Sequence, residues 1–108
     1  MIIVTTGYVP GREISEVLGL AIGNVVMSKH VGRDLAAALK TLAGGEIKGY
    51  TEMLTEARNL AIERMIKEAE RLGADAVIGM RLGSSSVMSG AAEMVAYGTA
   101  VKLKSNGK

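Results

Sequence analysis

Hydrophobic positions along this chain of 108 residues follow a period of two in some regions and a helical period in others. Residues 2–6 are apolar and β-branched, which predicts a short strand. Residues 7–12 hold the single proline of the chain between two glycines and predict a loop. Residues 13–29 alternate and predict a long strand, in which Gly19 and Gly23 share one face. Two glycines on one face indicate a bend or the close approach of another backbone.

The middle of the chain predicts two helices. A short helix over residues 33–43 has Asp34 in its first turn, where the helix dipole favours an acid, and a stripe of leucines. A longer helix runs from Thr51, a predicted N-cap, to Leu72. Gly73 follows as the residue expected just after a helix end.

Alternating residues 75–82 and 93–104 predict two further strands, and the turn-rich residues 83–90 predict a flexible connection between them. Joined in this way, the two strands predict an antiparallel hairpin. The resulting order is ββααββ, which is an α+β fold with two layers and with helices on one face of an antiparallel sheet. We expect a single domain over residues 1–104 and a flexible C-terminal tail over residues 105–108.

The composition changes this picture from a monomer to an assembly. Hydrophobic residues make up 48% of the chain and charged residues 22%, which is little polar cover for a small domain. The apolar arc of the long helix is also wider than packing on one sheet requires, and Ile62 and Ile66 lead the excess. That excess predicts contact with the short helix or with another subunit. We therefore expect a homo-oligomer.

Several classes of function are disfavoured by the same composition. The chain has no cysteine, which excludes disulfides and thiolate chemistry. Its net charge is +2, without a basic stripe interleaved with aromatic residues, so a nucleic-acid partner is not expected. No apolar run reaches the length of a membrane span, and the N-terminus has no signal-like layout. We expect a cytoplasmic protein without a membrane partner.

The chain resembles the YbjQ-like family, which is labelled as heavy-metal-binding and is otherwise functionally uncharacterised. The resemblance covers most of the chain, in the same order, through these pieces: Thr5-Thr6 with the Pro10-Gly11 loop, Gly32-Arg33-Asp34, the helix pattern from Tyr50 through Ala69, residues 73–81, and residues 96–101. It implies a somewhat dodecin-like two-layer subunit that assembles as a pentameric ring through edge-strand contacts. One departure concerns Leu82 and Gly83, because the family often has an aromatic residue and an acid there.

The heavy-metal label has limited support among the side chains. Soft metals favour thiolate, thioether and imidazole ligands, and the chain offers one histidine, His30, and seven methionines. One imidazole does not build a closed tetrahedral site within one subunit. A site would need His30 from several subunits, or His30 with Asp34, or sulfur from Met88 and Met94. Methionine at strand and helix spacing is more often core filler, so no cofactor is expected and an intersubunit metal ion is the alternative.

Two polar pairs in predicted loops or helix starts are candidates for ligand binding. Arg33 and Asp34 stand where a helix begins and would bind an anion or a polar ligand there, but the favoured interpretation is that Asp34 caps the helix and Arg33 forms a structural ion pair. Tyr8 and Arg12 flank the proline and would line the rim of a pocket, or simply anchor the loop.

Arg81 is a charge within an apolar strand, and Glu93 at the start of the facing strand is its obvious partner. Arg81 would line a pocket or the inside of a ring, or would form an intersubunit salt bridge. Residues 84–86 are serines without a partnered base, so nucleophilic catalysis is not supported. The sequence therefore predicts a non-enzymatic homo-oligomer that binds a small ligand at its subunit interfaces. Heavy-metal binding and an enzyme with an intersubunit site are the alternatives.

Overall fold

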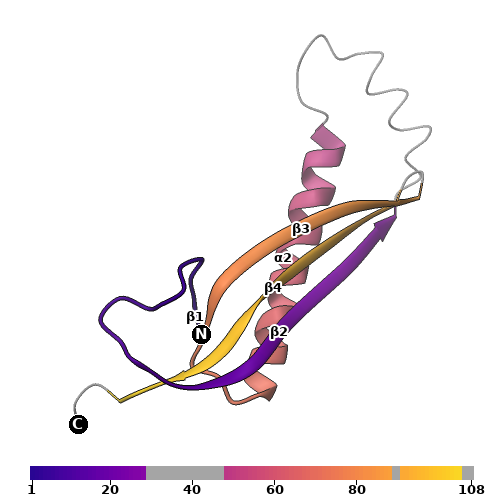
Figure 1. The fold of residues 1–108 in the computed structure, drawn as a ribbon. Helices are drawn as coiled ribbons and strands as arrows, with labels where there is room; N and C mark the ends of the chain where they lie inside the picture. Colours follow the sequence, from indigo (N-terminus) through magenta and orange to yellow (C-terminus); the bar gives the residue numbers. More distant parts are fainter. Residues whose placement is uncertain (29–47, 89–90, 106–108) are drawn as a thin grey trace.

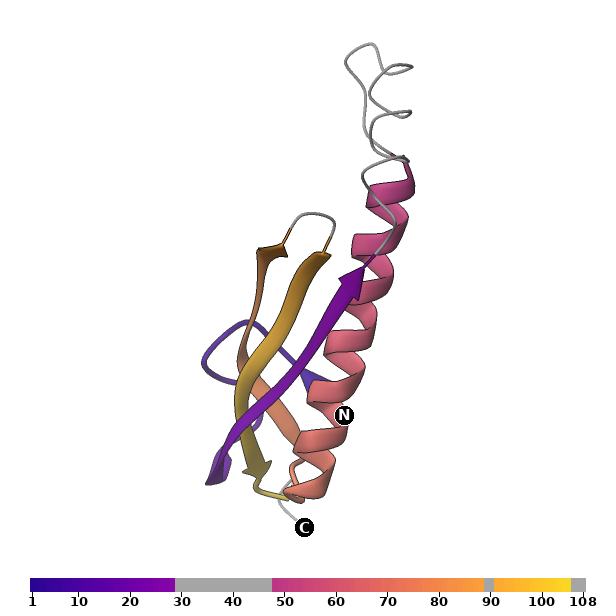
Figure 2. The ribbon, with the colours of Figure 1, turned by 90° about the vertical axis from the view of Figure 1, so that its right-hand side faces the viewer.

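The computed structural model describes residues 1–28, 48–88 and 91–105, which form a four-stranded sheet with a helix on one face (Figures 1 and 2). The elements in chain order are β1 (Ile2–Ile3), β2 (Ile14–Ser28), α2 (Lys48–Arg71), β3 (Ala76–Met88) and β4 (Ala91–Leu103). The predicted α+β class is confirmed. The predicted short helix over residues 33–43 lies outside the described residues, within which the order is ββαββ.

The strands lie in the order β1-β3-β4-β2. β4 pairs antiparallel with both β2 and β3, as predicted for the last two strands. β1 pairs parallel with β3, so the sheet is mixed and not purely antiparallel. The chain continues along β3 past the end of β1, because Val4 and Thr6 exchange backbone hydrogen bonds with Val77, Met80 and Gly79.

Two predicted boundaries are wrong. Residues 83–88 continue β3 instead of forming a flexible connection, because the serines of this segment pair in register with β4 from Ala92 to Met94. Strand pairing here overrides the weak local preference of serine and glycine for turns. The helix begins at Lys48, three residues before the predicted N-cap Thr51. Its end matches the prediction, because Gly73 has a φ of 81° just beyond the last turn.

The end of α2 is a Schellman motif. Ala74 N–H donates to the Ala69 carbonyl at 3.0 Å, and Gly73 N–H donates to the Glu70 carbonyl at 2.9 Å. These two bonds satisfy carbonyl groups that the helix leaves without a partner, and the left-handed turn that they require favours glycine.

α2 packs mainly on β2 and β4, through small residues on both sides of the contact. Every fourth residue of the helix is buried there: Met53, Ala57, Ala61, Met65 and Ala69. Opposite them, a Cβ added to Gly23 of β2 would meet the Ala61 carbonyl oxygen and the Met65 nitrogen. The close approach of another backbone, predicted from the glycine pair, is therefore found at Gly23. The predicted bend is found at Gly19, which has a φ of 130° beside a register shift.

The apolar excess lies on a different element from the one predicted. Ile62 and Ile66 are half-buried and pack against the core beneath their own helix. The outward side of α2 carries exposed charged residues, including Glu56, Glu63 and Lys67. Consequently, among the described side chains, the outward side of α2 shows no wide apolar stripe, and the exposed apolar surface is on the sheet.

Candidate functional site

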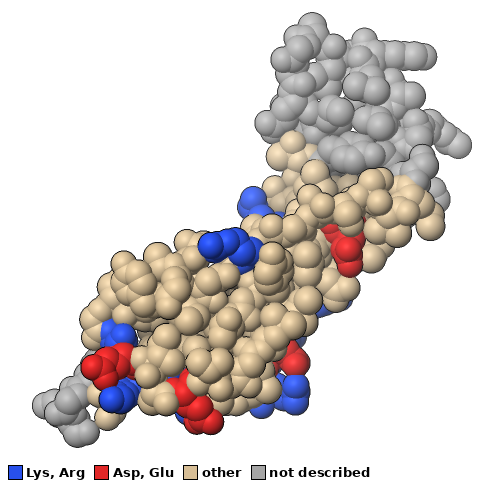
Figure 3. Space-filling model, viewed as in Figure 1, with Lys and Arg blue, Asp and Glu red and all other residues tan. Residues whose placement is uncertain are grey.

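The face of the sheet opposite α2 is half covered. Toward β1 and the start of β2, Val9 from the N-terminal loop packs on Ala76, Val101 and Leu103 and makes a second small core. Beyond this core no other described element packs on the face, and we call this part the open face. Cross-strand register and exposure assign the following residues to it: Leu20, Ile22, Asn24 and Val26 of β2, Arg81, Gly83 and Ser85 of β3, and Glu93, Val95 and Tyr97 of β4. Figure 3 shows this side as largely uncharged.

Large aliphatic side chains point outward on the open face. Leu20 is 60% exposed, Ile22 47% and Val26 56%, whereas their neighbours Ala21 and Val25 are buried under α2. In this part of the strand, Ala21 therefore lies in the core while the larger Leu20 and Ile22 are exposed. A contiguous apolar patch of this kind on a small domain indicates an interaction surface.

One polar row crosses the open face. Asn24 Nδ2 donates to Glu93 Oε2 at 3.5 Å, and Ser85 Oγ donates to Glu93 Oε1 at 3.4 Å. Glu93 of β4 is in register with Ser85 of β3, and Asn24 of β2 lies diagonally across, because its own register partner is Val95. Sequence reasoning selected Glu93 but missed Asn24 and Ser85, because their alignment depends on a register that no local motif encodes.

Arg81 and Glu93 are not joined within the chain. Arg81 Nη1 donates to the Thr5 and Met80 carbonyl oxygens, each at 2.9 Å, and so fastens the N-terminal segment to β3. Arg81 is in register with Tyr97, four residues along β4 from Glu93, which corresponds to about 13 Å. The predicted pairing of these two charges is therefore not formed in one subunit, and its intersubunit version stays a prediction.

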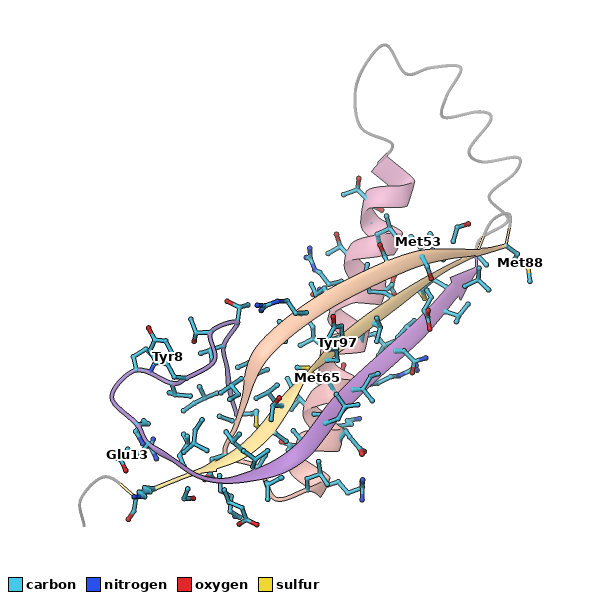
Figure 4. The ribbon with its side chains drawn as sticks, viewed as in Figure 1. Tyr8, Glu13, Met53, Met65, Met88 and Tyr97 are labelled. Carbon is cyan, nitrogen blue, oxygen red and sulfur yellow. The ribbon has the colours of Figure 1, made fainter. Side chains whose placement is uncertain are left out.

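The other predicted ligand residues do not gather with this pair. Tyr8 is exposed in the N-terminal loop, away from the open face (Figure 4). Arg12 Nη2 in the same loop donates to the Lys104 carbonyl at 3.1 Å, which fits the anchoring role. The predicted candidates His30, Arg33 and Asp34 lie outside the described residues. The four ligand-binding candidates that the structure describes, Tyr8, Arg12, Arg81 and Glu93, thus do not form one site.

Among residues 1–28, 48–88 and 91–105, two stretches of strand have an edge that no other described strand covers. β2 is an outer strand along its whole length, and β3 is uncovered from Leu82 to Met88 because β1 and the segment after it accompany only its first residues. The two edges lie at the same level, because Val26 and Ser85 are both in register with Glu93. On β2, the Asn24 carbonyl accepts a hydrogen bond of 2.9 Å from Arg64 Nη1 of α2.

A hollow of about 390 Å³ lies beside the uncovered part of β3 on the side of α2. Its lining consists of Met53, Leu54, Met88, Ala91, Ala92 and residues 84–86. Ser84 faces this hollow, since it is in register with Met94, which packs against the core under α2. Within residues 1–28, 48–88 and 91–105, no recorded hydrogen bond involves the side chain of Ser84.

Metal-ligating groups do not cluster in what is described. Among residues 1–28, 48–88 and 91–105, no three His, Cys, Asp or Glu side chains come close enough to hold an ion. Met53 and Met88 line the same hollow, and no other soft ligand stands among the described residues that line it. Over the same residues, no helix is long and apolar enough to cross a membrane.

Comparison with known proteins places the chain in a family. A family model described as "Putative heavy-metal-binding", of the YbjQ group, matches residues 1–104. A UPF0145 protein of Thermotoga petrophila is 75% identical over 104 residues, covering 96% of this chain and 98% of that protein. Another, from Vibrio campbellii, is 61% identical over 103 residues, covering 95% and 99%.

The fold has a counterpart among solved structures. A crystal structure of a protein of unknown function from Pediococcus pentosaceus, of the DUF74 family, matches with a TM-score of 0.53 at 19% identity, covering 96% of this chain and 98% of that one. At this identity the match concerns the fold alone. The predicted resemblance is confirmed by the family model and by relatives that are 61% and 75% identical, and the chain belongs to the YbjQ family of UPF0145 proteins.

Proposed function

We propose that this protein is a non-enzymatic homo-oligomer whose subunits join head to tail into a ring, five by family resemblance, and that the ring holds a small ligand at its seams. The supporting observation is the open face, where Leu20, Ile22 and Val26 stay about half exposed. Burying a large aliphatic side chain contributes roughly 1.5–3 kcal/mol when it is complete, so covering this patch favours association.

The two uncovered edges suggest how the copies meet. β2 and β3 both run antiparallel to β4, so they run parallel to one another. If β2 of one copy lies beside β3 of the next, the strands pair in parallel and the sheet continues. Because two different edges meet, the contact is heterologous, and such a contact closes into a ring when its rotation permits.

Hydrogen-bond directions on the two edges fit this pairing. The Asn24 carbonyl faces away from β4 toward Arg64, so by the alternation of an antiparallel ladder Asn24 has both backbone groups outward. Val95, opposite Asn24, then directs its groups to Gly83, which leaves Leu82 and Ser84 with their groups outward. In a parallel pair, the N–H and C=O of one residue bond to the two residues on either side of the residue opposite it on the neighbouring strand. Asn24 of one copy is thus suited to Leu82 and Ser84 of the next.

The continued sheet gives the ring a lining. The open faces of successive copies would form one apolar surface, crossed at each copy by the row of Asn24, Glu93 and Ser85. Such a surface suits an apolar molecule with a polar group that meets this row. The alternative of an intersubunit metal site at His30 rests on a residue outside the described part. The alternative of an enzyme has no candidate site among the described residues. A cytoplasmic location is part of the same proposal.

Disulfide cross-linking tests the seam, because the chain has no cysteine of its own. Val26 and Ser85 lie on either side of Glu93 in one subunit, about 10 Å apart, beyond the Cα separation of about 4–7 Å that a disulfide spans. In the proposed seam, Val26 of one copy lies next to Ser85 of the other. Oxidation of a chain with both Val26→Cys and Ser85→Cys should give a ladder of covalent multimers on a non-reducing gel.

The largest covalent multimer on the gel gives the number of subunits in the ring, and we expect five. A second pair, Val26→Cys with Gly83→Cys, tests a seam shifted by two residues. The matched control pairs Val26→Cys with Asn59→Cys, because Asn59 is exposed on the outward side of α2. Covalent dimers without higher species would indicate a two-fold contact in place of a ring. Cross-linking no stronger than in the control, for both pairs, would contradict the edge-to-edge seam.

A further inference from the structure

Arg64 reaches from α2 to the outer edge of β2. Its side chain is exposed, and its Nη1 donates to the Asn24 carbonyl at 2.9 Å. The helix lies close enough for this reach because Gly23, the residue before Asn24, lets the backbone of α2 sit directly on the strand. None of the three ion pairs recorded among the described residues includes Arg64.

The guanidinium therefore has donors to spare at the place where the next subunit would join. An arginine carries five N–H donors in a planar fork, and a carbonyl oxygen has two lone pairs. The Asn24 carbonyl can accept from Arg64 and from a neighbouring strand together. Arg64 thus leaves the edge of β2 open to pairing, and the remaining N–H donors of its guanidinium are available to a neighbouring subunit.

Ser84 is the complementary group on the other uncovered edge. Its backbone groups face outward, and its side chain points to the side of the sheet that carries α2, into the hollow next to Met53 and Leu54. Its level on β3 is the level of Val25 on β2, because both are in register with Met94. In a parallel seam this places Ser84 of one copy one strand spacing, about 5 Å, from the edge that Arg64 covers.

We propose that Arg64 is an intersubunit connector: its guanidinium enters the hollow over β3 of the next copy and donates to the Ser84 hydroxyl, while the Ser84 amide donates to the Asn24 carbonyl. This inference rests on the proposed ring and adds its specificity-determining contact. The hollow is polar where the fork enters, at Ser84, and apolar along Met53 and Leu54, which suits the stem of an arginine. Among the described residues that line the hollow none is charged, so a hydroxyl and not a carboxylate is the partner.

A double-mutant cycle on assembly tests this pair. Arg64→Ala, Ser84→Ala and the double variant are compared with wild type by sedimentation velocity over a dilution series, which gives the concentration of half-dissociation. Each single change is expected to raise that concentration about tenfold, as for a hydrogen bond from a charged group, and the double variant to raise it no further. Arg58→Ala and Asn59→Ala, at exposed residues of the same helix, are the controls. Circular dichroism melting reports subunit folding separately.

The outcomes separate this inference from the ring itself. A wild-type protein that stays monomeric removes the ring and the connector together. A wild-type oligomer in which Arg64→Ala behaves like Arg58→Ala keeps the ring and overturns the connector. Effects that add fully in the double variant overturn the pairing of Arg64 with Ser84. Tighter assembly of Arg64→Ala would show that Arg64 blocks the β2 edge, which also overturns the inference.

Discussion

Gly23→Ala is the most direct test of how α2 sits on the sheet. The added methyl group would meet the Ala61 carbonyl oxygen and the Met65 nitrogen, which belong to the backbone and cannot rotate away. To restore ordinary contact the helix must move off β2 by about 1 Å, which loosens the packing of Ala61 and Met65 on the strand. Overpacking of this kind costs about 3 kcal/mol, and for a domain of this size it lowers the melting temperature by roughly 10–20 °C.

Thermal unfolding followed by circular dichroism at one fixed protein concentration measures this effect. Gly7→Ala is the matched control, since no atom lies within 4 Å of its added methyl group and its φ is not positive. We expect the control to stay within about 0.5 kcal/mol of wild type. If Gly23→Ala and Gly7→Ala have the same melting temperature, the close contact between α2 and β2 is wrong, and so is the position of Arg64 that depends on it.

Two further predictions concern the edge of β3 and the end of α2. Ser84→Pro should give a folded subunit that does not assemble, because the lost N–H faces the uncovered edge of β3. Ser85→Pro should fail to fold, because its N–H faces β4. Circular dichroism measures folding and gel filtration measures assembly, so together they distinguish the two results. The pKa of Glu68 lies below its ordinary value, because the side chain of Arg71 donates hydrogen bonds of 2.6 and 3.1 Å to its carboxylate. Because the Glu68 pKa is lowered in the folded state, its carboxylate stabilises the fold at pH values above its ordinary pKa. This stabilisation is lost as the pH falls through the lowered pKa. Arg71→Ala should therefore raise the Glu68 pKa in an NMR titration, and an unchanged value would contradict the assignment.

Much of the fold follows from local patterns in the sequence. The long strand, the long helix, its end at Gly73 and the antiparallel pairing of β3 with β4 all rest on periodicity or on a residue with a special backbone preference. The extension of β3 through residues 84–86 could not be predicted in this way. Serines have no strong preference of their own, and only the register with β4 makes them a strand.

The site was less accessible to sequence reasoning, for a physical reason. Period two in β2 divides its residues into two faces but does not say which face is the core. Here Ala21 and Gly23 are inside because α2 needs a flat surface, and the larger Leu20 and Ile22 are outside. The same limit applies to Asn24, since its place beside Glu93 depends on register across three strands. The sequence predicted an apolar excess on the helix, whereas the described structure has its exposed aliphatic residues Leu20, Ile22 and Val26 on the sheet.

The mass of the native protein in solution tests the central claim most directly. Native mass spectrometry and sedimentation equilibrium report how many chains of 11.3 kDa travel together. We predict a discrete assembly, about five times the subunit mass, that persists on dilution to micromolar concentration. A compact particle of a single subunit mass at millimolar concentration, with Leu20 and Ile22 left in solvent, would contradict the proposal that copies of the chain cover the open face.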